Sequence, residues 1–192
     1  PAPVIEKLSS KECYVNRILI SLALFFISIS TGADEYSFAD ASIKIPAGFE
    51  GPFEQSMEPG TSAIAFRHLH GDGNDATLLQ ITIWNPGKSF PEMSDDELKE
   101  GAAQYLAQFL SGVARKRNNF KQGDVEFITI SDVPVAKVDW SGDLGLKKAH
   151  GVMYCYRFNS KIVSLHTQDL VEFNELYLEQ AVKAFETIKL AR

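Results

Sequence analysis

Cysteine is scarce in this sequence, which limits how the fold can be cross-linked. Cys13 and Cys155 are the only two cysteines among 192 residues. Cys13 precedes the single long hydrophobic run of the chain, which has the pattern of a cleavable export signal. Cleavage after that run would leave Cys155 as a lone thiol, so an internal disulfide is excluded in the processed chain. No cysteine directly follows the run, which argues against a lipid-anchored protein.

Short active-site motifs are missing as well. The sequence contains no Gly-x-Ser-x-Gly, no phosphate-binding P-loop, no His-Glu-x-x-His and no Cys-x-x-Cys. The turn Asp72-Gly73-Asn74-Asp75 lacks the spacing of an EF-hand calcium loop. We therefore predict a protein that is not an enzyme, with no catalytic residue and no cofactor.

Basic side chains are outnumbered by acidic ones. The chain has 25 acidic and 19 basic residues and a net charge of −6 at pH 7. A surface of this sign repels the phosphates of nucleic acids and of anionic lipids. We predict no nucleic-acid partner.

The hydrophobic run extends from Ile18 to Ile29, after Arg17 and before the small residues 30–33. This order of a cation, a short apolar segment and small residues is typical of a signal peptide. As a helix the run would span roughly 18 Å, too short for the roughly 30 Å core of a bilayer. A buried helix is the other alternative, but the run has almost no polar face. Residues 1–33 are predicted to be a leader plus signal peptide, and we hypothesise that translation starts at Val15.

Residues 34–192 are then expected to form a single exported globular domain, periplasmic or secreted, with no stable membrane span. Its first half predicts strands and then a helix. We expect a hairpin over 36–46, a loop over 51–60, and strands over 61–70 and 77–84. Ser94-Asp95-Asp96-Glu97 is a capping box, and the apolar spacing that follows predicts a long helix ending near Arg115-Lys116-Arg117. That basic triplet is interpreted as complementing the helix dipole, with a docking patch as the alternative.

The second half predicts an antiparallel meander and a closing helix. Strands are expected over 125–130, 133–140, 149–158 and 161–167, and an amphipathic helix over 172–190. A two-residue loop at Asn159-Ser160 would pair Tyr154 with Leu165 on one face of the sheet, and Met153 with His166 on the other. The expected fold class is α+β, with an antiparallel meander sheet covered by two main helices.

A family resemblance agrees with this element order. The segments Ile43-Lys44-Ile45-Pro46-Ala47-Gly48-Phe49 and Ala184-Phe185-Glu186-Thr187-Ile188 resemble those of the PsbP and Mog-type superfamily, over roughly residues 36–190. The resemblance implies an α/β/α sandwich and a non-catalytic binding role. Members include accessory subunits of photosystem II, a nuclear-transport regulator and bacterial exported proteins. The resemblance supplies no site residue.

One group of residues has the composition of a metal site. His68 and His70 lie two positions apart on an expected strand, so both imidazoles would face the same side, with Asp72 and Asp75 just beyond. Imidazole and carboxylate together suit Zn²⁺ or Cu²⁺. The alternative is that the strand leaves the core at a polar turn and the histidines are solvated.

Two further features allow a functional and a structural interpretation. The Cys155 thiol, with His150 and His166 nearby, is either a nucleophile with a base or a small buried apolar residue. Trp84, Trp140 and Tyr177 mark either a partner surface or the packed faces of the sheet.

Three functional hypotheses remain. The first is an exported, non-catalytic binding or accessory protein that acts through a protein partner. The second is a metal-binding protein or metal-dependent enzyme that uses His68 and His70. The third is an immunity-type neutraliser of a toxic protein, in which the acidic surface would recognise a basic target.

Overall fold

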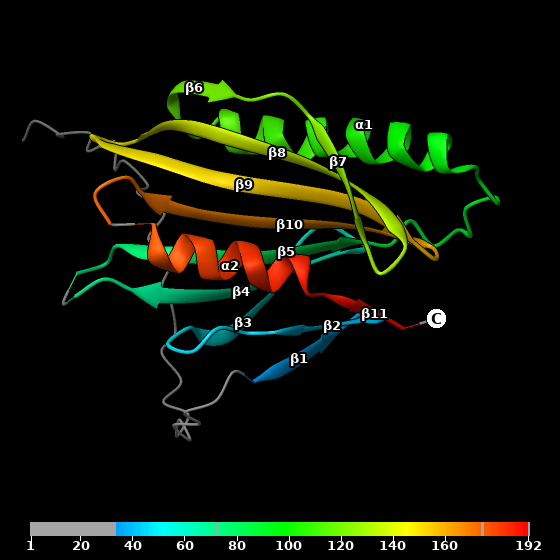
Figure 1. Ribbon diagram of the computed structural model, residues 1–192, viewed down its shortest axis with the longest axis horizontal. Helices are drawn as coiled ribbons and strands as arrows, with labels where there is room; N and C mark the ends of the chain where they lie inside the picture. Colours follow the sequence, from blue (N-terminus) through cyan, green and yellow to red (C-terminus); the bar gives the residue numbers. More distant parts are fainter. Residues whose placement is uncertain (1–33, 72, 174, 192) are drawn as a thin grey trace, which may run out of the picture.

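One large antiparallel sheet forms the centre of the molecule (Figure 1). The computed structural model describes residues 34–71, 73–173 and 175–191. Within them the main sheet has 8 strands in the order β3-β4-β5-β10-β9-β8-β6, and β7 pairs with β8. The strands are β3 (Glu50–Ser56), β4 (Thr61–Leu69), β5 (Ala76–Trp84), β6 (Asn118–Gln122), β7 (Glu126–Ile130), β8 (Val133–Leu144), β9 (Lys147–Phe158) and β10 (Lys161–Leu170).

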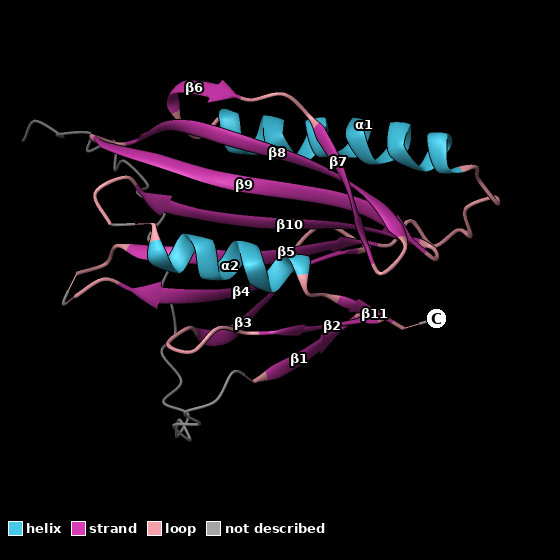
Figure 2. Ribbon diagram, in the orientation of Figure 1, coloured by secondary structure: helices cyan, strands magenta, loops and turns pink. Residues whose placement is uncertain are grey.

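Two helices and a small second sheet pack against the main sheet (Figure 2). Helix α1 (Asp95–Ala114) contacts β8 and β9, whereas α2 (Leu176–Glu186) contacts β5 and β10. The second sheet has 3 strands, β1 (Glu35–Phe38), β2 (Ala41–Lys44) and β11 (Lys189–Leu190), and it also contacts α2. The predicted α+β class is confirmed, but the second sheet adds a strand, β11, that the sequence did not predict.

Alternation along β9 places the two helices on opposite faces of the main sheet. Tyr154 and Tyr156 belong to the apolar cluster that includes Phe185 of α2, whereas Met153 and Cys155 belong to the cluster that includes α1. Successive side chains of a strand point to opposite faces. Each helix therefore buries its own side of the sheet.

The capping box predicted at the start of α1 is confirmed. The backbone N–H of Glu97 donates to Ser94 Oγ (3.4 Å), and the N–H of Ser94 donates to Glu97 Oε2 (2.8 Å). At the other end Arg115 Nε donates to the Ser111 carbonyl (3.3 Å) and Arg117 Nη1 to the Val113 carbonyl (3.1 Å). The two arginines thus satisfy carbonyl groups at the negative end of the helix, as the dipole interpretation expects.

The predicted register of the β9–β10 hairpin is also confirmed. Tyr154 pairs with Leu165, and Met153 pairs with His166. The pairing is set by the two-residue turn, in which Asn159 has a φ of 54°. His166 therefore faces the α1 side of the sheet.

The two faces of the sheet differ in polarity at strands β5 and β10. On the α2 side Leu79, Ile81 and Leu165 are fully buried. On the α1 side these strands present Gln80 opposite His166 and Thr82 opposite Ser164. Because α1 lies mainly on β8 and β9, it does not cover this polar surface completely.

Two expectations about the strand boundaries are wrong. Part of the loop expected over residues 51–60 is strand β3, and the strand expected to end at residue 140 continues to Leu144 as β8. β3 is an edge strand that pairs only with β4 among the described residues, and an edge strand tolerates the missing N–H of Pro52. Gly142 lies where a Cβ would be 3.3 Å from the Asn118 carbonyl, so its small size lets β6 approach β8.

The ends of the last helix are also corrected. α2 begins at Leu176 and ends at Glu186, rather than extending over residues 172–190. Lys189 and Leu190 instead pair with Ser42 and Ala41 of β2. The amphipathic pattern continued past the helix because Ile188, beyond its end, is buried in the same cluster.

Strands β8, β9 and β10 approach one another closely at Gly151. A Cβ on this residue would lie 2.7 Å from the Trp140 ring and in contact with the Thr167 carbonyl. Real Cβ atoms do not come this near to other atoms, so a larger residue would displace one of these strands. Trp140 is buried over this position.

The leader and signal peptide predicted for residues 1–33, including Cys13 and the start at Val15, lie outside the described residues. None of the helices in the described part of the chain has the length and apolar character needed to cross a membrane.

Candidate functional site

His68 and His70 lie side by side at the end of β4, as their spacing predicts. Their ring centroids are 5.5 Å apart. The His68 ring stacks on Tyr177 of α2 (3.4 Å), and its Nδ1 lies 2.8 Å from the Gly48 carbonyl oxygen. The His70 ring stacks on Phe173 (3.8 Å). Both histidines therefore stack on aromatic rings, with the His70 side chain 8% exposed and His68 half-buried, so the alternative of solvated histidines does not describe His70.

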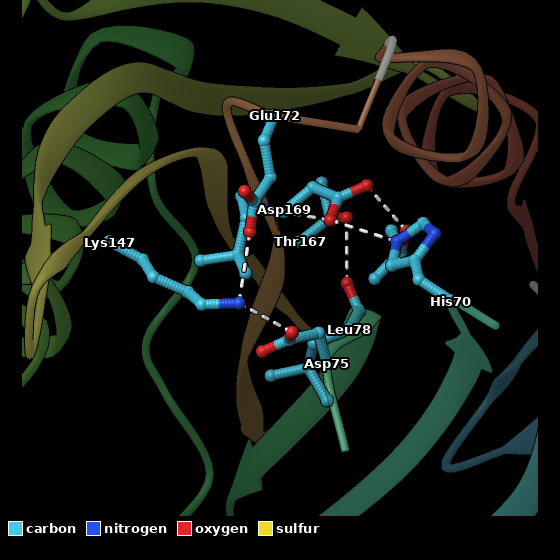
Figure 3. A network of polar contacts seen from close by, with 9 residues as sticks. His70, Asp75, Leu78, Lys147, Thr167, Asp169 and Glu172 are labelled. Atoms are coloured by element: carbon cyan, nitrogen blue, oxygen red, sulfur yellow. Dashed lines mark hydrogen bonds and ion pairs between the residues drawn. The ribbon is translucent and has the colours of Figure 1, made fainter. Parts of the chain in front are cut away.

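His70 belongs to a buried polar cluster (Figure 3). Its Nε2 lies 3.0 Å from Asp169 Oδ1 and 3.0 Å from Thr77 Oγ1. Thr77 Oγ1 donates to Asp169 Oδ2 (2.6 Å), and the backbone N–H of Leu170 donates to Asp169 Oδ1 (2.8 Å). Asp169 is 2% exposed, so these donors are what makes a buried carboxylate tolerable.

The cluster does not have the geometry of a catalytic triad. In a triad the imidazole holds the carboxylate with one nitrogen and takes the hydroxyl proton with the other. Here the same Nε2 faces both groups, and the Thr77 hydroxyl donates directly to Asp169. We interpret the cluster as a polar connection between β5, β10 and the end of β4.

The other residues of the predicted metal site are arranged differently. Asp72 lies outside the described residues, and Asp75 forms an exposed ion pair with Lys147 (2.6 Å), which also contacts Glu172 (3.0 Å) (Figure 3). In the described part of the chain, no three His, Cys, Asp or Glu side chains are grouped to hold a metal ion. Metal binding by His68 and His70 stays a prediction.

Cys155 is fully buried, and burial raises the pKa of its thiol to about 12. A thiol in this state is not ionised near neutral pH and is a poor nucleophile. His150 lies elsewhere, with its Nδ1 3.6 Å from Glu175 Oε1. The structure therefore favours the interpretation of Cys155 as a small buried apolar residue.

The aromatic candidates for a partner surface mostly pack inside the fold. Trp140 is buried, with its ring centroid 4.7 Å from the Arg117 guanidinium. Trp84 is half-buried beside Tyr105 of α1 (5.7 Å), and Tyr177 is half-buried against His68.

A cavity that the sequence analysis did not foresee lies between α1 and the polar side of β5 and β10. Its volume is about 720 Å³. We call it the groove. Its floor carries polar side chains from two neighbouring strands: Gln80, Thr82, Ser164, His166 and Gln168. Its wall comes from the C-terminal part of α1 and the residues after it: Phe109, Gly112, Val113, Arg115, Lys116 and Arg117.

His166 on the floor of the groove is 7% exposed, and its Nε2 has no hydrogen-bond partner among the described residues. Burial, together with the nearby positive charge of Arg117, lowers the pKa of His166 to about 3. The imidazole is therefore neutral at physiological pH. A buried polar atom without a partner costs about 1–3 kcal/mol, so a ligand that bonds to it would recover that free energy.

Arg117 lies half-buried in the wall and is held in place by its neighbours. It donates to the Val113 carbonyl and to Gln168 Oε1, and it lies over the Trp140 ring. Burial lowers the pKa of its guanidinium. Arg117 Nε and Trp140 Nε1 are buried and, within the described residues, have no partner. Three unpaired polar atoms thus come from residues at or next to the groove.

The comparisons with known proteins agree with the fold. No protein-family model matches the sequence, and no curated protein does either. Among solved structures, cyanobacterial PsbP (CyanoP) from Synechocystis is similar with a TM-score of 0.58 and 10% identity, over 88% of this chain and 98% of that one. A protein from Bacteroides thetaiotaomicron is similar with a TM-score of 0.51 and 10% identity, over 85% of this chain and 50% of that chain. The chain therefore has a PsbP-like fold, as the resemblance predicted, and spans half the length of the Bacteroides protein.

We predict that Asp169→Ala strongly destabilises the protein. It would leave His70 and Thr77 with only each other as partners and would remove the side-chain acceptor of the Leu170 amide, at about 1–3 kcal/mol for each buried group that stays unpaired. Asp75→Ala is the matched control, because it removes an exposed ion pair and should change stability little. Urea unfolding measures both. Equal effects of the two substitutions would contradict the structural role given to Asp169.

We also predict that His166 makes stability depend on pH. Its folded pKa is below the usual value of about 6.5, so between pH 6.5 and 3 the unfolded chain binds the proton and the folded chain does not. The contribution of His166 to the free energy of unfolding is then fully present above pH 6.5. It decreases as the pH falls below this value, by up to about 1.4 kcal/mol per pH unit. The free energy of unfolding of the wild type minus that of His166→Gln should therefore decrease from pH 7 to pH 5. A difference that is constant over this range would show that His166 titrates normally.

Proposed function

We propose that this chain is an exported, non-catalytic binding or accessory protein with an α/β/α layered fold, and that the groove is its binding site. The observation that carries the proposal is the polar floor, where the buried His166 Nε2 has no partner among the described residues. Folded proteins pair nearly all their buried polar atoms, and an exception at a cavity is typical of a place where a ligand completes the pairing.

The non-catalytic part of the proposal is supported by the state of the candidate nucleophiles. Cys155 is buried with a raised pKa, and the Thr77 hydroxyl donates to the Asp169 carboxylate although His70 Nε2 also lies 3.0 Å from it. The export part is supported by the pattern of Arg17 to Ala33 in the sequence. The protein partner predicted from the sequence remains part of the accessory role.

The neutraliser hypothesis receives no support from the groove. A basic target would meet Arg115, Lys116 and Arg117 there and would be repelled. If the protein neutralises such a target, it must use another, acidic part of its surface.

The metal hypothesis can be tested directly at His68 and His70. If these residues hold a metal ion, protein incubated with Zn²⁺ or Cu²⁺ and then desalted should retain stoichiometric metal. The double change His68→Phe and His70→Gln should abolish retention, because Phe keeps the ring contact with Tyr177 and the Gln amide can still donate to Asp169. His150→Phe is the matched control at a histidine outside the pair. Wild-type protein without metal, measured by elemental analysis, would contradict the hypothesis.

The groove can be blocked at Gly112 to test the proposed binding function. A Cβ at this position would meet no atom within 4 Å, so Gly112→Trp should fill the groove without disturbing the fold. Gly112→Ala is the matched control, and it should stabilise the helix by about 0.5–1 kcal/mol.

We expect the wild type and Gly112→Ala, expressed in the native host and isolated from the exported fraction, to carry the same bound molecule or protein. Gly112→Trp should have lost it. Native mass spectrometry of the three proteins checks this. The proposal is wrong if the wild type carries nothing, or if Gly112→Trp carries the same molecule.

A further inference from the structure

We propose that the groove binds a small organic anion with an apolar body, such as an acyl or aryl carboxylate or phosphate. This inference rests on the proposed function, because it names the chemical class that the groove takes. It follows from the charge of the wall, the hydrogen-bonding groups of the floor, and the apolar residues between them.

The charge of the groove is opposite to that of the whole protein. Its lining includes Arg115, Lys116 and Arg117, whereas no Asp or Glu is among the described residues that line it. The chain as a whole carries 25 acidic and 19 basic residues. An anion would therefore be repelled by most of the surface and attracted to the groove, which favours selective binding there.

Arg117 is the best-placed cation for the acidic group of such a ligand. Its contacts with Trp140 and the Val113 carbonyl hold the guanidinium in one place, so little side-chain freedom remains to be lost on binding. Burial makes its interaction with an anion stronger than that of a surface arginine. Its Nε, without a partner in the described residues, is a donor that is still unused.

The floor supplies hydrogen-bonding groups that suit oxygen atoms. Thr82 and Ser164 have hydroxyl groups, and Gln80 and Gln168 have amides. His166 is neutral and can donate through Nε2 in the tautomer that carries a proton there. In small-molecule sites a few polar groups and a charged residue fix the orientation of the ligand, and the floor and Arg117 supply such groups here.

The apolar body would contact side chains on both sides of the groove. Leu78 of β5 and Met153 of β9 lie on the sheet, and Phe109 and Val113 lie on α1. The volume of about 720 Å³ lies within the roughly 300–1,000 Å³ of small-molecule sites. A free inorganic anion would leave these apolar surfaces exposed, so the site fits an amphiphilic anion better.

The test uses two fluorescent probes that differ only in charge. Anilinonaphthalene sulfonate carries an anionic group on an aromatic body, and phenylnaphthylamine has the same body without the charge. We expect saturable binding of the sulfonate with at least about tenfold higher affinity than the neutral probe, a difference of about 1.4 kcal/mol. Near-ultraviolet circular dichroism must stay native, because the sulfonate also binds partly unfolded states.

Substitutions and competitors locate the site and identify the acidic group. Gly112→Trp should abolish binding of the sulfonate, and Gly112→Ala should retain it. The double change Arg115→Gln and Lys116→Gln, on two exposed side chains, should weaken binding about tenfold and reduce its dependence on salt. Displacement of the sulfonate by laurate or by dodecyl phosphate distinguishes a carboxylate from a phosphate ligand. Dodecanol, which has no acidic group, should not displace the sulfonate.

The inference is overturned if the sulfonate does not bind, if the neutral probe binds equally well, or if Gly112→Trp binds as the wild type does. These results are separable from failure of the proposed function. A host protein carried by the wild type but not by Gly112→Trp, together with no binding of the sulfonate, would keep the groove as a binding site and exclude the small anion.

Discussion

Burial of apolar side chains between α2 and the main sheet is the interaction on which the rest of the structure depends. Leu79, Ile81, Leu165 and Phe185 are fully buried there, and each such side chain contributes roughly 1.5–3 kcal/mol. Because strand side chains alternate, this face also determines which residues point the other way. The polar floor of the groove is thus the reverse side of the apolar core.

The groove exists because α1 covers only part of that reverse side. Ala102, Leu106 and Leu110 of α1 are buried over β8 and β9, which are apolar on this face. Strands β5 and β10 offer α1 no comparable surface, since the half-buried Gln80 and Gln168 would lose water without gaining enough partners. The helix therefore packs over β8 and β9 and not over the polar floor. This position leaves space beside Gly112.

Local patterns predicted much of the fold but not the site. The turn at Asn159 and the capping box at Ser94 act over a few residues, so register and helix start followed from the sequence. Strand β3 was missed because the effect of Pro52 depends on whether its strand lies at an edge, which is a tertiary property. The groove combines residues from α1, β5 and β10, far apart in the chain. Its one local signal was polar residues at alternate positions of two strands otherwise rich in apolar residues.

Gly151 links the packing of the sheet to the width of the groove although it does not line it. Any side chain there would press on Trp140 and on the carbonyl of Thr167, the residue next to His166. The strand that carries the floor would have to shift. A substitution at this one position beside the floor would therefore change the width of the proposed binding groove while every residue that lines it stayed the same.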